Sequence, residues 1–332
     1  MLAGRHPRDG VAGPRPWRRV RAGKRITVLA AIAAVVASAA LVCGARSAPP
    51  AAAVTATASP YLLALGGSAS VGFQPTLSHP RGQRTRDGYA EDLVRLEQHR
   101  WPGLTVVHLG CPGATTVTVL EGGGKCAYAD GSQLQATEAF LRTHHTTVLV
   151  TVDLGFNDLL SCLRHEVVNA PCVETSLATV HRQLTQILAA IKAAVPSGAR
   201  IVGVGHYDPY LGDYLRGGGG EAFAVASLNV MERLDATLRG DYAAAGVPIA
   251  DVSSAFDLGD RRDVRWSGLP TVPTDVARTC ALTWMCSHAP FGHNVHPDDA
   301  GYRAIASAIA AAVAGSSGKP VAVASGKPVA SA

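Results

Sequence analysis

Four residues in this sequence combine side chains and turn positions that suit the hydrolysis of an ester. Ser68 follows a short apolar run, Gly113 and Asn157 each follow a later one, and His296 precedes the last helical pattern. A serine hydroxyl becomes a nucleophile when a neighbouring histidine accepts its proton. The oxyanion formed by its attack needs preorganised donors, which the backbone N–H groups of Ser68 and Gly113 and the side-chain amide of Asn157 would supply.

Each of these residues also has a purely structural interpretation. The serine and the glycine could be turn residues, the asparagine could form an Asx turn, and the histidine could mark a helix entrance. A metal site is a further alternative, with three histidines as candidate ligands: His288, His293 and His296. Their spacing fits no metal-binding motif with a known mechanism, so we expect neither a metal nor an organic cofactor.

Alternating strand and helix patterns place the four residues at one edge of a parallel sheet. Apolar runs predict strands at residues 61–65, 104–109, 147–154, 201–205 and 247–252. Helical spacing of apolar residues predicts helices at 87–98, 133–142, 176–195, 222–238 and 298–313, with insertions at 211–220 and 257–285. This alternation is typical of an α/β domain with a doubly wound sheet of about five parallel strands. Ligands of such sheets bind beyond the carboxyl ends of the strands, where the four residues fall.

The four sequence blocks around these residues resemble those of the SGNH (GDSL-type) hydrolases, in particular secreted actinobacterial esterases and lipases with three disulfides. The Gly-x-Asn-Asp sequence at 155–158 and the His-Pro-x-x-x-Gly sequence at 296–301 match the family pattern. The resemblance implies a three-layer α/β/α, flavodoxin-like fold over residues 60–314. It also implies a set of roles: Ser68 as nucleophile, His296 as general base, and Ser68, Gly113 and Asn157 as oxyanion-hole donors.

Three positions depart from the family pattern. Gly67 replaces the aspartate of the Gly-Asp-Ser-Leu block, and His108 replaces the asparagine that usually opens the second block. His293 lies three residues before His296, at the position of the family's catalytic acid, and it cannot act as a carboxylate. We therefore expect a serine–histidine dyad, in which a backbone carbonyl of His293 or Asn294 orients the catalytic histidine.

The charge distribution indicates an export signal rather than a nucleic-acid-binding protein. Residues 1–48 hold nine Lys or Arg residues and one acidic residue, which leaves 21 basic and 24 acidic residues in the rest of the chain. A basic face for nucleic acid is therefore not expected. Arginines precede an apolar run at 26–42, so residues 1–48 are expected to be an export signal with cleavage between 48 and 58. An uncleaved membrane anchor is the alternative.

Composition also marks the remaining segments. Residues 49–59 are rich in Ala, Pro and Thr and are expected to be a linker before the hydrolase domain. Residues 315–332 repeat the sequence Ser-Gly-Lys-Pro-Val-Ala and are expected to form a low-complexity, disordered tail.

The cysteines agree with an exported protein. Cys43 lies in the leader, and the six other cysteines allow 15 pairings, among which sequence alone cannot choose. Their spacing favours three local disulfides: Cys111–Cys126, Cys162–Cys172 and Cys280–Cys286.

Together these features predict a secreted or otherwise extracytoplasmic serine esterase or lipase that acts through an acyl-enzyme. The candidate substrates are lipid esters, short acyl esters and acetylated glycans, and no nucleic-acid or obligate protein partner is expected. The alternatives are a carbohydrate acetylesterase, a non-catalytic ligand- or glycan-binding protein on a degenerate hydrolase scaffold, and a metal-dependent hydrolase.

Overall fold

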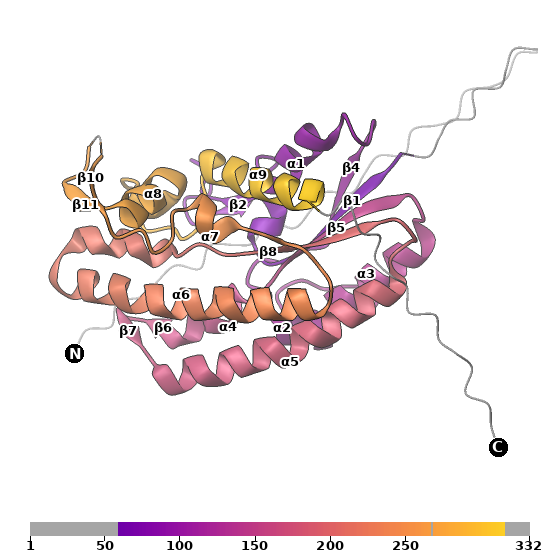
Figure 1. Cartoon of the computed structure of the whole chain (residues 1–332), viewed down its shortest axis with the longest axis horizontal. Coiled ribbons are helices and arrows are strands. Elements are labelled where there is room, and N and C mark those ends of the chain that lie inside the picture. The colour runs from indigo at the N-terminus through magenta and orange to yellow at the C-terminus, as the bar shows by residue number, and fades with distance from the viewer. Residues whose placement is uncertain (1–58, 267, 316–332) are drawn as a thin grey trace, which may run out of the picture. The chain divides into compact units, whose positions relative to one another are not determined.

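Five parallel strands form the central sheet in the spatial order β4-β1-β5-β8-β9 (Figure 1). The computed structural model describes residues 59–266 and 268–315. The sheet strands are β1 (Tyr61–Gly66), β4 (Thr105–His108), β5 (Thr147–Asp153), β8 (Arg200–Val204) and β9 (Ile249–Ala250). Counted within the sheet this order is 2-1-3-4-5, so the predicted flavodoxin-like, doubly wound architecture is confirmed. The expected export signal, nearly all of the linker and the tail beyond Gly315 lie outside the described residues.

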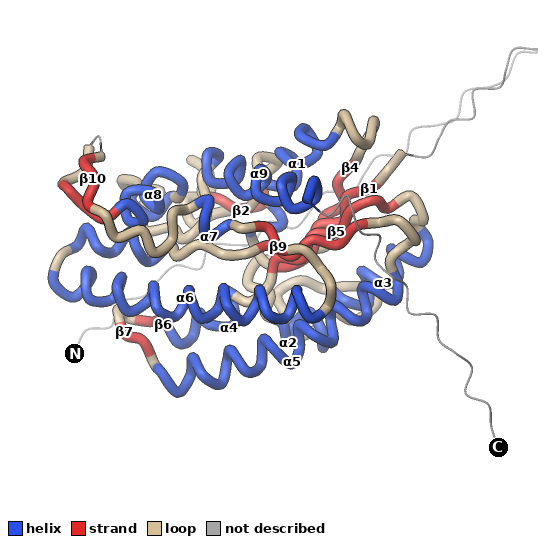
Figure 2. The backbone as a smooth tube through the Cα atoms, in the orientation of Figure 1, coloured by secondary structure: helices blue, strands red, loops and turns tan. Residues whose placement is uncertain are grey.

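Helices cover both faces of this sheet and give the three predicted layers (Figure 2). Leu63 and Val152 point to one face, and Leu62 and Leu149 point to the other. The first face packs on α2 (Thr116–Glu121), α3 (Gln133–Thr143), α5 (Ala170–Ala194) and α6 (Gly218–Ala244), and the second on α1 (Tyr89–Glu97) and α9 (Asp299–Gly315). Burial on both faces explains why the inner strands are continuous apolar runs instead of alternating patterns.

Several element boundaries differ from the sequence prediction. The helix α5 begins at Ala170 instead of 176, because the Asn169 side chain accepts a hydrogen bond from the Cys172 N–H and a proline occupies the first turn. The helix α6 begins at Gly218, within glycines that were expected to form an insertion. Among the described helices, including these two long ones, none has the length and apolar character needed to cross a membrane.

The last strand is also shorter than predicted. It ends at Ala250 because Asp251 caps the short helix α7 (Val252–Ala255), with its side chain accepting from the Ser254 N–H. The expected insertion at 257–285 contains the antiparallel hairpin β10 (Asp263–Arg265) and β11 (Thr271–Pro273), then α8 (Thr274–Leu282) and η4 (Trp284–Cys286). The other small elements are η1 (Ala69–Val71), β2 (Phe73–Gln74), β3 (Gln83–Arg84), α4 (Phe156–Leu159), η2 (Leu160–Cys162), β6 (Leu163–Arg164), β7 (Val167–Val168) and η3 (Pro209–Arg216).

Three disulfides are present, with the pairing that the sequence spacing favoured. They join Cys111 to Cys126, Cys162 to Cys172 and Cys280 to Cys286. Each closes a loop of 6 to 15 residues, so these bonds stabilise local segments next to the sheet edge.

The packing of α6 on the sheet depends on a glycine, which gives a first prediction. A Cβ at Gly203 on β8 would lie 2.5 Å from the buried ring of Tyr242, whereas a Cβ at Gly240 on α6 would meet no atom within 4 Å. We expect Gly203→Ala to lower the free energy of unfolding by about 1–3 kcal/mol through overpacking. We expect the matched Gly240→Ala to raise it by about 0.5–1 kcal/mol, because alanine is the better helix former. Urea unfolding of both variants measures the difference, and equal stabilities would contradict this view of the interface.

Candidate active site

Ser68 lies in the turn that follows β1, at the carboxyl edge of the central sheet. Gly66 ends this strand with a φ of 129°, and a Cβ there would lie 2.1 Å from the Asp153 carbonyl oxygen, so no side chain fits. The amide of Gln133 on α3 accepts from the Gly66 N–H at 2.7 Å and donates to its carbonyl at 3.2 Å. These bonds fix the end of β1 and therefore the position of Ser68.

Ser70 ties the turn around the nucleophile candidate to its surroundings. Its hydroxyl donates to the Gly67 carbonyl at 2.7 Å, and its own carbonyl accepts from His108 Nδ1 at 2.8 Å. The other ring nitrogen of His108 lies 2.8 Å from Glu91 Oε1 on α1. A carbonyl can only accept, so Nδ1 carries a hydrogen, and the second nitrogen shares a proton with the carboxylate.

This arrangement gives His108, one of the three departures from the family pattern, a structural role. Burial lowers the pKa of His108, but its hydrogen bonds to Glu91 and to the Ser70 carbonyl outweigh that effect, so the pKa is raised. Relative to a free histidine, the shift favours the charged form, which can donate from both nitrogens.

The structure brings Ser68 and His296 into direct hydrogen-bonding contact. His296 Nε2 lies 2.9 Å from Ser68 Oγ, and Nδ1 lies 2.7 Å from Oδ1 of the Asn294 side chain. The same Asn294 oxygen accepts from the backbone N–H of His296 at 3.1 Å, which identifies it as the oxygen of the amide. Nδ1 therefore carries the hydrogen, and Nε2 has the free lone pair that can accept the serine proton.

The orienting group differs from the predicted one. A backbone carbonyl of His293 or Asn294 was expected, but the side-chain oxygen of Asn294 makes the contact. The reason is an Asx turn, in which the asparagine oxygen bonds the N–H two residues later and so comes to lie beside the ring. His293 adopts a φ of 55° and donates its N–H to the Met285 carbonyl, so the position of the family's acid serves to shape the loop.

The half-buried His296 ring packs against apolar and backbone groups. Its ring centroid lies 4.8 Å from that of Phe73, its carbonyl accepts from the Trp284 N–H at 3.0 Å, and the preceding Val295 carbonyl accepts from the Tyr207 hydroxyl at 2.8 Å. Burial lowers the pKa of His296 to about 4, because the charged imidazolium loses its solvation. At neutral pH the ring is therefore the free base that proton abstraction requires.

The two other expected site residues lie beside Ser68. Gly113 and Asn157 line the same cavity as the serine. Asn157 Nδ2 donates to the Ala114 carbonyl at 2.9 Å, which orients the amide. A Cβ at Gly67 would lie 2.9 Å from this nitrogen, so the glycine that replaces the family's aspartate leaves room for the amide.

Asp158 joins the loop that carries Asn157 to the loop that carries Gly113. Its carboxylate accepts from the backbone N–H of Thr116 at 3.1 Å and from the Thr116 hydroxyl at 2.7 Å, at the start of α2. Burial raises the pKa of Asp158, and these hydrogen bonds counteract the rise because they favour the carboxylate. Two loops from different strands are thus held at a fixed separation.

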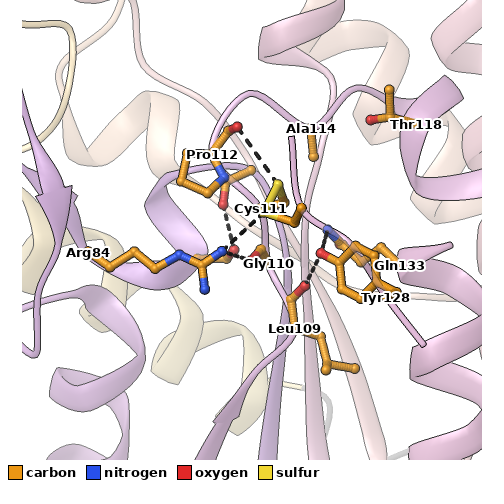
Figure 3. Close-up of a disulfide and its surroundings, with 12 residues drawn as sticks. Arg84, Leu109, Gly110, Cys111, Pro112, Ala114, Thr118, Tyr128 and Gln133 are labelled. Atoms are coloured by element: carbon orange, nitrogen blue, oxygen red, sulfur yellow. Dashed lines mark hydrogen bonds between the residues drawn. A yellow bond between two sulfur atoms is a disulfide. The ribbon is translucent and has the colours of Figure 1, made fainter. Parts of the chain in front are cut away.

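The Cys111–Cys126 disulfide anchors the segment that contains Gly113 (Figure 3). Arg84 donates from Nη2 to the Gly110 carbonyl at 3.1 Å and to Cys126 Sγ at 3.2 Å, so the β2–β3 hairpin is fastened to the same segment. Gly113 itself has a φ of 84°, a conformation that favours glycine.

A cavity of about 220 Å³ opens above Ser68 and His296. Its apolar lining includes Phe73, Leu154, Phe156, Leu160 and Val295, and its charged or titratable lining beyond the dyad comes from Lys125, Asp153, His206 and Tyr207. Within residues 59–266 and 268–315, no three His, Cys, Asp or Glu side chains are grouped so as to hold a metal ion. Apolar walls with a few polar groups are typical of a site for a small molecule.

The fold and the arrangement of these sequence blocks define a hydrolase of the SGNH type, with a flavodoxin-like α/β/α fold. The sequence model of the GDSL-like lipase/acylhydrolase family matches residues 64–304. This chain therefore belongs to the GDSL-like lipase/acylhydrolase family.

Solved structures of similar fold include three named hydrolases. An extracellular lipase from Streptomyces rimosus is 21% identical, with 77% of this chain and 100% of that chain covered and a TM-score of 0.48. Phospholipase A1 from Streptomyces albidoflavus NA297 is 21% identical, with coverages of 67% and 95% and a TM-score of 0.40. The aryl esterase of M. smegmatis is 16% identical, with coverages of 77% and 99% and a TM-score of 0.39. A comparison with curated protein sequences finds no match.

The burial of His296 predicts an unusual titration. We expect NMR of histidine-labelled protein to show the His296 ring neutral, with its hydrogen on Nδ1, at pH 7 and a midpoint at about pH 4. Because burial disfavours the charged form, the ring takes up its proton only in more acidic solution than a free histidine. The variant Asn294→Asp should move this midpoint upward, since a carboxylate stabilises the imidazolium. A midpoint near the usual histidine value in the native protein would contradict the burial argument.

Proposed function

We propose that this protein is a serine esterase that hydrolyses carboxylic esters through an acyl-enzyme intermediate. The observation that carries the proposal is the 2.9 Å contact between Ser68 Oγ and His296 Nε2, with the far side of the ring held by Asn294. A serine is activated when a base accepts its hydrogen bond and a third group orients that base, and Ser68, His296 and Asn294 form such a series.

In the proposed mechanism, Ser68 Oγ attacks the ester carbonyl carbon while its proton passes to His296 Nε2. The negative charge formed on the carbonyl oxygen is stabilised by the backbone N–H groups of Ser68 and Gly113 and by the Asn157 amide. The intermediate collapses as the bond to the alcohol oxygen breaks and His296 returns the proton to that oxygen. Water then attacks the acyl-enzyme in the same way, with His296 taking its proton and returning it to Ser68, which releases the carboxylic acid.

We also propose that the enzyme works outside the cytoplasm, with residues 60–314 as its catalytic domain and residues 1–48 as an export signal. Three disulfides support this location, because such bonds persist in oxidising compartments and are rare in the cytosol. The basic and apolar pattern of the leader supports it independently.

Replacement of the nucleophile tests the reaction class directly. We expect Ser68→Ala to lower kcat for p-nitrophenyl butyrate by about 10³-fold or more and to abolish covalent labelling by a fluorophosphonate. The exposed Ser307 on α9 offers a matched control, and Ser307→Ala should hydrolyse and label like the native protein. A folded native protein that neither labels nor hydrolyses any ester would rule out the esterase and favour a binding function on this scaffold.

Two replacements of Asn294 test how the histidine is oriented. We expect Asn294→Ala to lower kcat by about ten- to a hundredfold, because Nδ1 of His296 loses its hydrogen-bond acceptor. A positioned general base contributes about 10²- to 10⁴-fold to the rate, and this variant should lose part of that contribution. We expect Asn294→Asp to retain activity at neutral pH and to shift the acidic limb of the kcat profile to higher pH, since the carboxylate raises the pKa of His296. The exposed Asn229 provides the control variant Asn229→Asp. Identical pH profiles for Asn294→Asp and the native enzyme would show that residue 294 does not act on the histidine.

A further inference from the structure

One positively charged side chain, that of Lys125, lines the active-site cavity beside Gly113, the proposed oxyanion-hole glycine. Lys125 lines the cavity together with Ser68 and Gly113. A Cβ built on Gly113 would lie 3.4 Å from Lys125 Nζ and 3.6 Å from Cε, so the end of the lysine side chain crosses over the glycine. Its ammonium group is therefore close to the place where the ester carbonyl must bind.

The chain connectivity holds the lysine at this place. Lys125 directly precedes Cys126, and Gly113 follows Cys111 by two residues, so the disulfide between these cysteines brings residues 113 and 125 together. Figure 3 shows this disulfide next to Pro112 and the Arg84 guanidinium. The position of the lysine thus follows from a covalent bond and not only from the conformation of a glycine-rich loop.

The charge of Lys125 is available to a ligand. It is the one lysine or arginine among the residues that line this cavity, and no ion pair to it forms within the described parts of the chain. The lysine is exposed, so a ligand that enters the cavity from solvent can reach its ammonium group. The acidic lining residue Asp153 is buried and faces His206 Nδ1 at 3.8 Å, so it does not pair with the lysine.

We infer that Lys125 is a specificity-determining residue, which binds a carboxylate carried by the ester substrate close to its scissile bond. The inference rests on the proposed esterase function and narrows it to anionic esters. The anion interacts with the ammonium while the carbonyl carbon lies at Ser68 Oγ and the carbonyl oxygen faces Gly113 and Asn157. Because the lysine adjoins the oxyanion site, an anionic group on either the acyl or the alcohol side lies within its reach.

Two pairs of esters test the inference and distinguish the two sides of the substrate. The first pair, p-nitrophenyl pentanoate and mono-p-nitrophenyl glutarate, differs by a carboxylate on the acyl side. The second pair, methyl 4-acetoxybenzoate and 4-acetoxybenzoate, differs by a carboxylate on the alcohol side. The ratio of kcat/KM for the anionic to the neutral ester is measured in each variant, so that the intrinsic reactivity of the esters cancels when variants are compared.

The chain offers a matched control, because Lys192 on α5 is the one other lysine among the described residues. We expect Lys125→Met to lower the anionic-to-neutral ratio by about two- to fivefold for at least one pair, the range of an exposed ion pair. We expect Lys125→Arg to preserve the ratio and Lys192→Met to leave it unchanged. Raising the salt concentration to about 0.5 M should weaken the preference of the native enzyme, because salt screens exposed charges.

The possible results separate this inference from the proposed function. An unchanged ratio for both pairs in Lys125→Met, with an active enzyme, overturns the inference and leaves the esterase intact. An equal loss on the neutral and anionic esters also overturns it, because the lysine would then act on the oxyanion common to all esters. If the native protein hydrolyses none of the four esters and is not labelled by a fluorophosphonate, the esterase function fails and the inference fails with it.

Discussion

The tight turn after β1 is the constraint on which the rest of the site depends. It is held from three directions: Gly66 by the Gln133 amide, the Gly67 N–H by the Asp153 carbonyl at 2.9 Å, and Ser70 by the His108 ring. A nucleophilic serine must hold its hydroxyl within about 0.5 Å of the productive position relative to its base, and this requires a fixed backbone. The helices on the two faces contribute because α3 carries the amide and α1 carries the carboxylate that pairs with His108.

The neutral partner of His296 shapes the chemistry that the site can perform. The Asn294 oxygen fixes the tautomer and the angle of the ring as a carboxylate would, but it adds no negative charge to stabilise an imidazolium. Burial acts in the same direction and lowers the pKa of the ring to about 4. The histidine is therefore fully available as a base at neutral pH, whereas its protonated form is less stable than in a full triad. In the proposed mechanism, the oxyanion donors must then supply more of the stabilisation of the transition state.

Local sequence patterns predicted the fold well, and long-range contacts limited the prediction of the site. The apolar runs identified all five sheet strands, because strands buried on both faces leave a signal in consecutive residues. The glycines at the start of α6 were read as an insertion, since glycine weakens helix propensity and packing decides the outcome here. The offset of three residues from His296 pointed to His293, but the rotamer of Asn294 decides which oxygen reaches the ring. The bond from Gln133 to Gly66 joins residues 67 positions apart, and nothing in either neighbourhood signals it.

Several polar side chains around this site form hydrogen bonds with the backbone of the loops that surround Ser68. Few polar atoms then remain to contact a substrate. Asp158 uses its carboxylate on Thr116, and Arg84 uses its guanidinium on the Gly110 carbonyl and the disulfide. Both bonds hold the segment that contains Gly113, which lines the same cavity as Ser68. Reduction of the Cys111–Cys126 bond would remove the covalent part of this support at the point where an oxyanion donor must be rigid. The geometry of the candidate active site is thus coupled to an oxidising environment, which agrees with the proposed location outside the cytoplasm.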